Sequence, residues 1–202
     1  MIFLESDFDK NLFFKHLKKK CSILDYGCGV GIWESKNNSG KFSYKFYLYD
    51  KSKLALKIVK DKYSSNKNFI VINNFKKIKI LKNKIDVLFL NSTIQYIKKN
   101  TLQKLLLNLS KILKKNYKII ISDIPKYNRL VEFFLIIFFY PRRIFSTIFI
   151  ITNFKNYLKK NKFYLNNLDF IFLKKNFNYK KIDNLNKFKL RYSLILEKKS
   201  KT

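Results

Sequence analysis

Residues 20–31 read Lys-Cys-Ser-Ile-Leu-Asp-Tyr-Gly-Cys-Gly-Val-Gly, and the prediction of the fold begins with them. Ser22 to Tyr26 forms a short apolar run of the kind found in buried strands. Gly27, Gly29 and Gly31 follow, so that three of the chain's four glycines fall within five residues. Glycines permit positive φ and let a ligand approach the backbone, whereas a plain turn needs only one of them. We therefore predict a strand, a ligand-binding loop and a helix that begins near Gly31.

The spacing of the glycines and one neighbouring acid restrict the ligand. The dinucleotide-binding fingerprint is Gly-x-Gly-x-x-Gly, but this loop reads Gly-x-Gly-x-Gly, and Glu34 stands where the final glycine of the fingerprint would fall. Asp25 lies two residues before the first glycine, where a carboxylate repels a pyrophosphate and pairs with the ammonium group of an amino acid. The sequence therefore disfavours hydride chemistry with a nicotinamide cofactor.

Short apolar runs alternate with helical patterns along the rest of the chain. The strands that we predict cover residues 22–26, 43–49, 69–72, 86–90 and 117–122, with a closing pair at 168–173 and 190–196. We predict helices over residues 9–20, after a Ser52 cap, and from Asn100, where Gln103 completes a capping box. Such alternation is typical of a doubly wound, mostly parallel α/β sheet, which binds its ligands at the carboxyl ends of the strands.

The apolar strand and its glycine loop resemble the first motif of the class I S-adenosylmethionine-dependent methyltransferases, which ends in Asp-x-Gly-Cys-Gly-x-Gly. The matching residues are Ile23, Leu24, Asp25, Gly27, Cys28, Gly29 and Gly31. The resemblance implies a Rossmann-like sheet of seven strands with an antiparallel last strand, and S-adenosylmethionine as the cofactor. In that family the glycine loop cradles the methionine and ribose portions, and an acid at the end of the second strand holds the ribose hydroxyls. Asp50 occupies that position, 19 residues after Gly31.

Later segments extend the resemblance to about residue 125. Asn73 and Asn74 follow the third strand, where the family often has an Asp that contacts adenine. Residues 85–96 are similar to the fourth-strand motif, which borders the transfer site, and residues 120–125 are similar to the fifth-strand motif. The cofactor-binding residues that the resemblance implies are Asp25, Gly27, Cys28, Gly29, Gly31, Asp50, Asn73, Asn74 and Asn91.

Three side chains are candidates for handling the acceptor. His16 is the only histidine and a candidate general base, although it also fits a packed position on the apolar stripe of the first predicted helix. Tyr96 and Asp123 belong to the fourth-strand and fifth-strand motifs, close to the expected transfer site. Alignment of nucleophile, methyl carbon and sulfur supplies much of the rate in such displacements, so the reaction does not require a dedicated base.

The formal net charge is +31, yet the composition does not indicate a nucleic-acid partner. The only arginines are Arg129, Arg142, Arg143 and Arg191, so the other 40 of the 44 basic residues are lysines. An AT-biased genome would produce this excess of lysine, and readers of guanine more often use arginine. The Pro-Pro-aromatic and Pro-Cys sequences of nucleic-acid methyltransferases do not follow the fourth strand. Nucleic acid is therefore disfavoured, and an RNA methyltransferase remains an alternative.

One apolar insertion, residues 126–162, interrupts the pattern within a single predicted domain of residues 1–202. Residues 133–151 are nearly all apolar, but Arg142 and Arg143 stand at their middle. The free energy of inserting this segment as a transmembrane helix is close to zero, because two central arginines cost about 5 to 7 kcal/mol and the apolar side chains contribute about 4 to 8 kcal/mol. We predict two short helices that form a lid or a dimer face, or a surface at 131–151 that meets lipid.

These observations together predict methyl transfer from S-adenosylmethionine to a small-molecule or lipid-linked acceptor, of which a saccharide hydroxyl is one example. The N-terminus lacks the long apolar run of a signal peptide, so we expect a cytoplasmic protein. The apolar segment at 131–151 is the candidate for peripheral contact with the inner membrane surface. Two cysteines and one histidine cannot form a four-ligand zinc site, so we expect no metal. A noncatalytic membrane-surface interaction protein on a methyltransferase scaffold is the second alternative.

Overall fold

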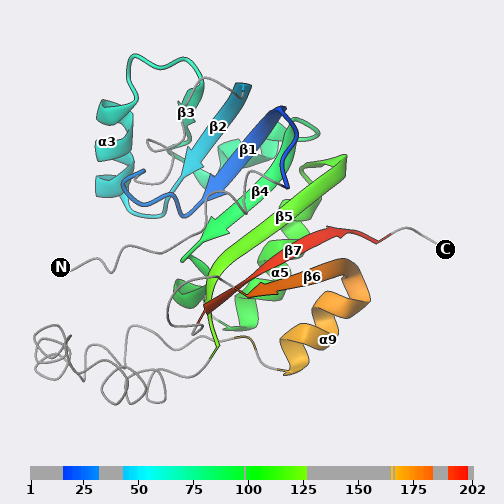
Figure 1. The fold of residues 1–202 in the computed structure, drawn as a ribbon. Helices are drawn as coiled ribbons and strands as arrows, with labels where there is room; N and C mark the ends of the chain where they lie inside the picture. Colours follow the sequence, from blue (N-terminus) through cyan, green and yellow to red (C-terminus); the bar gives the residue numbers. More distant parts are fainter. Residues whose placement is uncertain are drawn as a thin grey trace, which may run out of the picture.

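The computed structural model describes residues 16–31, 43–97, 99–126, 165, 167–183 and 191–199, which form one seven-stranded sheet. Its strands are β1 (Lys20–Tyr26), β2 (Ser43–Tyr49), β3 (Phe69–Val71), β4 (Ile85–Asn91), β5 (Leu113–Pro125), β6 (Phe177–Asp183) and β7 (Arg191–Lys198). The strand order is β3-β2-β1-β4-β5-β7-β6, and β7 pairs antiparallel with both β5 and β6 (Figure 1). The other pairs are parallel, so the predicted Rossmann-like, doubly wound α/β sheet is confirmed.

Helical segments connect the strands. They are α3 (Lys53–Lys62), α4 (Phe75–Ile78), the 3-10 turns η1 (Lys79–Leu81) and η2 (Ile94–Tyr96), α5 (Lys99–Ser110) and α9 (Asn167–Asn176). Ser52 caps α3 as predicted, because its hydroxyl accepts a hydrogen bond from the Ala55 N–H at 3.2 Å. The cap fixes the place where the chain leaves β2 and enters α3.

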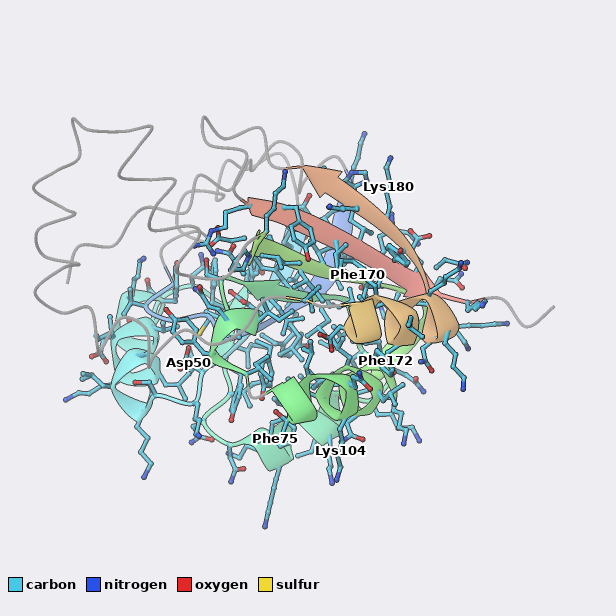
Figure 2. The ribbon with its side chains drawn as sticks, turned by 90° about the horizontal axis from the view of Figure 1, so that it is seen from below. Asp50, Phe75, Lys104, Phe170, Phe172 and Lys180 are labelled. Atoms are coloured by element: carbon cyan, nitrogen blue, oxygen red, sulfur yellow. The ribbon has the colours of Figure 1, made fainter. Side chains whose placement is uncertain are left out.

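The sheet is apolar on both faces, and alternate residues of each strand serve opposite faces. Leu24 and Leu88 belong to a cluster that also contains Leu106 of α5 and Leu173 of α9. Their strand neighbours serve a second cluster that contains Leu56 and Val59 of α3. Figure 2 shows α5 and α9 together on one side of the sheet, in agreement with the first cluster. The helices therefore cover both faces and leave the strand ends as the edges where a ligand can enter.

The prediction of a strand at 168–173 is wrong, because this segment lies within α9 and the edge strand is β6. The sequence Leu-Asp-Phe-Ile-Phe-Leu is a short apolar run, for which periodicity alone cannot separate a strand from a buried helix. Asp169 and Leu173 are buried four residues apart, whereas Ile171 between them is 63% exposed. Burial at i and i+4 is the signature of one helix face.

Two further predictions need correction at their boundaries. The described part of the predicted helix at 9–20 is not helical, since residues 16–19 are turns and bends and Lys20 already begins β1. Asn100 lies inside α5, which begins at Lys99, so it is not the residue that precedes the helix. Residues 9–15, the helix expected from Gly31 and nearly all of the insertion at 126–162 lie outside the described residues. Within the described part of the chain, no helix is long and apolar enough to cross a membrane.

The packing of α5 provides a test of this core. Leu106 is completely buried against the sheet, whereas its neighbour Leu107 is 38% exposed. We expect Leu106→Ala to lower the free energy of unfolding by about 3 kcal/mol, because the change leaves a cavity. Leu107→Ala is the matched control and should cost less than about 1 kcal/mol. Urea denaturation measures both, and equal losses would contradict the assignment of the buried face.

Candidate functional site

The glycine loop is tied to the carboxyl end of the neighbouring strand β2. The N–H groups of Gly27 and Cys28 both donate to the Tyr49 carbonyl, at 2.7 and 3.1 Å. The Gly31 N–H donates to the Cys28 carbonyl at 3.1 Å, which closes the turn. Since β1 and β2 are parallel neighbours in register, their ends meet here. The loop is therefore held in place by backbone hydrogen bonds.

Each of the three glycines has positive φ, but their surroundings differ. A Cβ at Gly27 would lie 2.4 Å from Oγ1 of Thr93, and a Cβ at Gly31 would lie 2.9 Å from Cε2 of Tyr63. At Gly29, with φ of +57°, a Cβ would meet no atom of the described residues within 4 Å. Packing therefore explains two of the glycines, whereas no described residue fills the space beside Gly29, where a ligand could approach the backbone.

Asp50 links the glycine loop to the first turn of α3. Its Oδ2 accepts a hydrogen bond from the Gly29 N–H at 2.9 Å, and its Oδ1 accepts one from the Ser52 N–H at 2.8 Å. Figure 2 shows Asp50 beside α3. A carboxylate offers about four lone-pair positions, so two such bonds leave capacity for hydroxyl donors of a ligand. The acid predicted from the sequence therefore also supports the loop.

The end of α3 holds the other side of the loop. The Tyr63 hydroxyl donates to the Gly31 carbonyl at 2.7 Å, and the Lys62 ammonium donates to the same oxygen at 2.5 Å. Sequence reasoning missed both residues, because they follow Gly31 by about 30 positions and belong to no local motif. Only the packing of α3 against the sheet brings them to the loop.

Aromatic rings lie beside the loop at the ends of β1 and β2. The centroids of Tyr26 and Tyr49 are 5.1 Å apart, and Phe75 at the start of α4 lies 6.2 and 6.0 Å from them. Burial, with smaller contributions from Tyr49 and Asp50, raises the pKa of Tyr26 to about 12. Its phenol therefore stays neutral near pH 7 and does not add negative charge to the site.

Two asparagines follow β3, and one of them caps the next helix. Both Asn73 and Asn74 are exposed. Asn74 caps α4, because its Oδ1 accepts a hydrogen bond from the Lys76 N–H at 2.8 Å. The structure thus places both residues at the carboxyl edge of the sheet with the loop, and Asn74 also stabilises the start of α4.

The ends of β4 and β5 bring further polar groups to this edge. Asn91 Oδ1 accepts a hydrogen bond from the Ser122 hydroxyl at 2.7 Å. The Thr93 hydroxyl lies 2.9 Å from the Asn91 carbonyl and 3.4 Å from the Gly27 carbonyl. Gln95 donates to the Ser92 carbonyl at 3.0 Å. These contacts join the fourth-strand motif to the glycine loop.

The acceptor candidates separate into two groups. Asp123 lies near the end of β5 and Tyr96, 67% exposed, ends η2, so both belong to the edge that carries the loop. His16 precedes β1 at its amino end, and its carbonyl accepts a hydrogen bond from Lys118. Seven residues of strand span about 20 Å, so His16 lies at the opposite edge and we leave it out of the proposed site. Asp25, predicted from the glycine motif, is fully buried at the end of β1.

Comparisons with known proteins agree with this geometry. A family model described as a methyltransferase domain matches residues 17–137, which is more than half of the chain. A search of curated proteins found no relative in sequence. Among solved structures, a protein from Sulfolobus solfataricus assigned to the type 11 methyltransferases is 23% identical with a TM-score of 0.60, and the match covers 96% of this chain and 92% of that one.

Two more solved structures share the fold at lower identity. A SAM-dependent methyltransferase from Aquifex aeolicus is 16% identical with a TM-score of 0.62, covering 95% of this chain and 90% of that one. The magnesium protoporphyrin IX methyltransferase from Synechocystis PCC 6803, solved with bound SAH, is 13% identical with a TM-score of 0.61. That match covers 94% of this chain and 78% of the Synechocystis protein.

The different surroundings of the glycines predict different costs of substitution. Gly27→Ala should lower the free energy of unfolding by about 3 kcal/mol, because it combines an unfavourable φ with a clash against Thr93. Gly29→Ala should cost only about 1 to 2 kcal/mol, the backbone part alone. Urea denaturation distinguishes the two variants. Combining Gly27→Ala with Thr93→Ala should recover part of the loss, and equal costs for the two glycines would refute the packing explanation.

Proposed function

The chain belongs to the methyltransferase domain family, with S-adenosylmethionine as its methyl donor, and we propose that it methylates a hydroxyl group of a small-molecule or lipid-linked acceptor, such as a saccharide. The observation that carries the proposal is the open space at Gly29, whose N–H is bound by the Asp50 carboxylate. No other glycine of the described loop is left open by its neighbours. The donor and the acceptor would meet at this edge of the sheet.

The chemistry of the described residues is suited to S-adenosylmethionine. The open face of Gly29 accommodates the close approach of a ligand, and the Asp50 carboxylate is suited to accept hydrogen bonds from two ribose hydroxyls. Phe75, 37% exposed, offers an apolar ring next to Asn73 and Asn74, where adenine would lie. When bound, the donor supplies an electrophilic methyl group on a positively charged sulfur, and the protein has to orient an acceptor against it.

The choice of a small or lipid-linked acceptor rests on features beside the donor site. Ser92, Thr93 and Asp123 provide hydroxyl and carboxylate groups suited to a hydroxylated acceptor. The apolar segment at 131–151, which lies outside the described residues, is the part of the sequence suited to lipid and to peripheral contact with the inner membrane surface. A cytoplasmic location is part of the same proposal.

Binding of S-adenosylhomocysteine tests the donor site. We expect micromolar binding to the wild type by calorimetry and at least a tenfold loss in Asp50→Ala, about 1.4 kcal/mol or more. Asp61→Ala is the matched control, because it removes the same charge from an exposed position on α3. Its affinity should stay within about threefold of the wild type. Absence of binding to the folded wild type would refute the enzyme function. It would favour the alternative of a noncatalytic membrane-surface interaction protein on a methyltransferase scaffold.

Transfer of label from methyl-labelled S-adenosylmethionine tests the acceptor class. Wild-type protein and Asp50→Ala are incubated with separated small-molecule, lipid and RNA fractions of the source cell. We expect label in the small-molecule or lipid fraction with the wild type and at least tenfold less with Asp50→Ala, the loss that its weaker binding predicts. Label in the RNA fraction, falling steeply with added salt, would replace this proposal by the RNA methyltransferase alternative.

A further inference from the structure

Two residues with unusual backbone conformations meet where β4 and β5 end. Ser92 has φ of +52° and Asp123 has φ of +59°, in the left-handed region that disfavours side chains with a Cβ. The Ser92 hydroxyl donates a hydrogen bond to Asp123 Oδ2 at 2.5 Å. The Ser92 N–H also donates to the Ser122 carbonyl at 3.2 Å. Backbone conformations of this kind, placed in contact at the ligand-binding edge of a sheet, point to a function.

A β-bulge sets the direction of Asp123. Ile121 pairs with Leu194 and Ile124 pairs with Tyr192, so two residues of β5 oppose one residue of β7. Such bulges occur next to active sites and aim a side chain that regular pleating would turn elsewhere. The bulge and the positive φ therefore act on the same residue, Asp123, and both lie near the end of the strand next to β4.

The carboxylate of Asp123 is held from two sides. Ser92 contacts Oδ2, and the Nε of Arg191 lies 3.8 Å from Oδ1. Arg191 also donates to the Asp123 carbonyl at 3.4 Å, and the two side chains are 16% and 17% exposed. This arrangement fixes the carboxylate while leaving part of it accessible from the edge of the sheet.

The pair connects to the glycine loop through the next residue in the chain, Thr93. Ser92 precedes Thr93, whose hydroxyl lies 3.4 Å from the Gly27 carbonyl. Two other acids at the same edge have different surroundings, since Asp25 is fully buried and Asp50 binds the N–H groups of Gly29 and Ser52. Among the acids that the structure describes at this edge, Asp123 is therefore the one best placed to meet both donor and acceptor.

We propose that Asp123, oriented by Ser92 and Arg191, is the carboxylate of the methyl-transfer site. It accepts a hydrogen bond from the acceptor hydroxyl and takes its proton as the acceptor oxygen forms a bond to the methyl carbon. The carbon–sulfur bond breaks, its electron pair remains on sulfur, and the positive charge of the sulfur is neutralised. Before transfer, the same carboxylate attracts the sulfonium cation. This inference rests on the proposed methyltransferase function.

The attraction to the sulfonium can be measured without knowing the acceptor. S-adenosylmethionine carries the positive sulfur and S-adenosylhomocysteine does not, so calorimetry of both ligands isolates the effect of charge. Asp123→Asn keeps the shape of the side chain, and Asn tolerates the left-handed conformation as Asp does. We expect this variant to weaken binding of S-adenosylmethionine by at least about tenfold and binding of S-adenosylhomocysteine by less than about threefold.

A matched carboxylate lies at the opposite edge of the sheet. Asp86 Oδ2 accepts hydrogen bonds from the Ser22 N–H at 2.9 Å and from Lys114 at 2.8 Å, and its side chain is 22% exposed. Asp86→Asn also leaves one cation without its partner, but far from the glycine loop. We expect it to leave the ratio of the two affinities unchanged, because salt screens charges over such a distance.

Ser92→Gly gives a second test that does not depend on the Asp123 variant. Glycine accepts the positive φ of Ser92 without strain, so the substitution removes the hydroxyl while favouring the observed backbone. We expect a loss of about threefold or more for S-adenosylmethionine with little change for S-adenosylhomocysteine, because the negative charge of Asp123 remains and only the charge-assisted hydrogen bond that orients its carboxylate is lost.

The outcomes separate this inference from the proposed function. A wild type that binds both ligands, together with affinity ratios in Asp123→Asn and Ser92→Gly equal to that of the wild type, would overturn the role of Asp123 alone. A change of the affinity ratio in Asp86→Asn as large as that in Asp123→Asn would also overturn this role, because it would show a general effect of charge. A folded wild type that binds neither ligand would overturn the methyltransferase function and this inference with it.

Discussion

The hydrogen bonds between the Asp50 carboxylate and the N–H groups of Gly29 and Ser52 are the contacts on which the site depends. They connect the end of β2 both to the loop that follows β1 and to the helix that follows β2. The Tyr49 carbonyl adds two further bonds to the same loop. Because unpaired backbone groups are costly, the chain must bring these two strand ends together, and parallel pairing of β1 with β2 does so.

The three glycines of the loop have different surroundings. Thr93 at the end of β4 leaves no room for a side chain at Gly27, and Tyr63 at the end of α3 leaves none at Gly31. Gly29 lies between them, and no described residue fills the space beside it. Packing therefore explains Gly27 and Gly31, and the approach of a ligand is our explanation for Gly29. Thr93 directly follows the strained Ser92. Because Thr93 contacts the Gly27 carbonyl and Ser92 contacts Asp123, the two residues connect the donor loop to the end of β5.

The sequence predicted every strand of the described sheet except β6. The alternating apolar runs predicted β1, β2, β4 and the core of β5, and the Ser52 cap marked the start of α3. Residues 168–173 were misassigned because a six-residue apolar run fits a strand and a helix equally well. Tyr63 and Arg191 could not be predicted as neighbours of the site, since each reaches it through tertiary packing rather than through local spacing. Ser92 belongs to the segment predicted to border the transfer site, but its contact with Asp123 depends on the bulge in β5 and could not be predicted.

We propose that Gly29 and Asp50 form the binding site of the methyl donor. A crystal structure of the protein with S-adenosylhomocysteine is the sharpest test of this site. We expect the nucleoside to lie against Gly29 and its ribose hydroxyls to donate hydrogen bonds to Asp50. A ligand bound away from the glycine loop, or bound there without contact to the Asp50 carboxylate, would show that the donor site lies elsewhere.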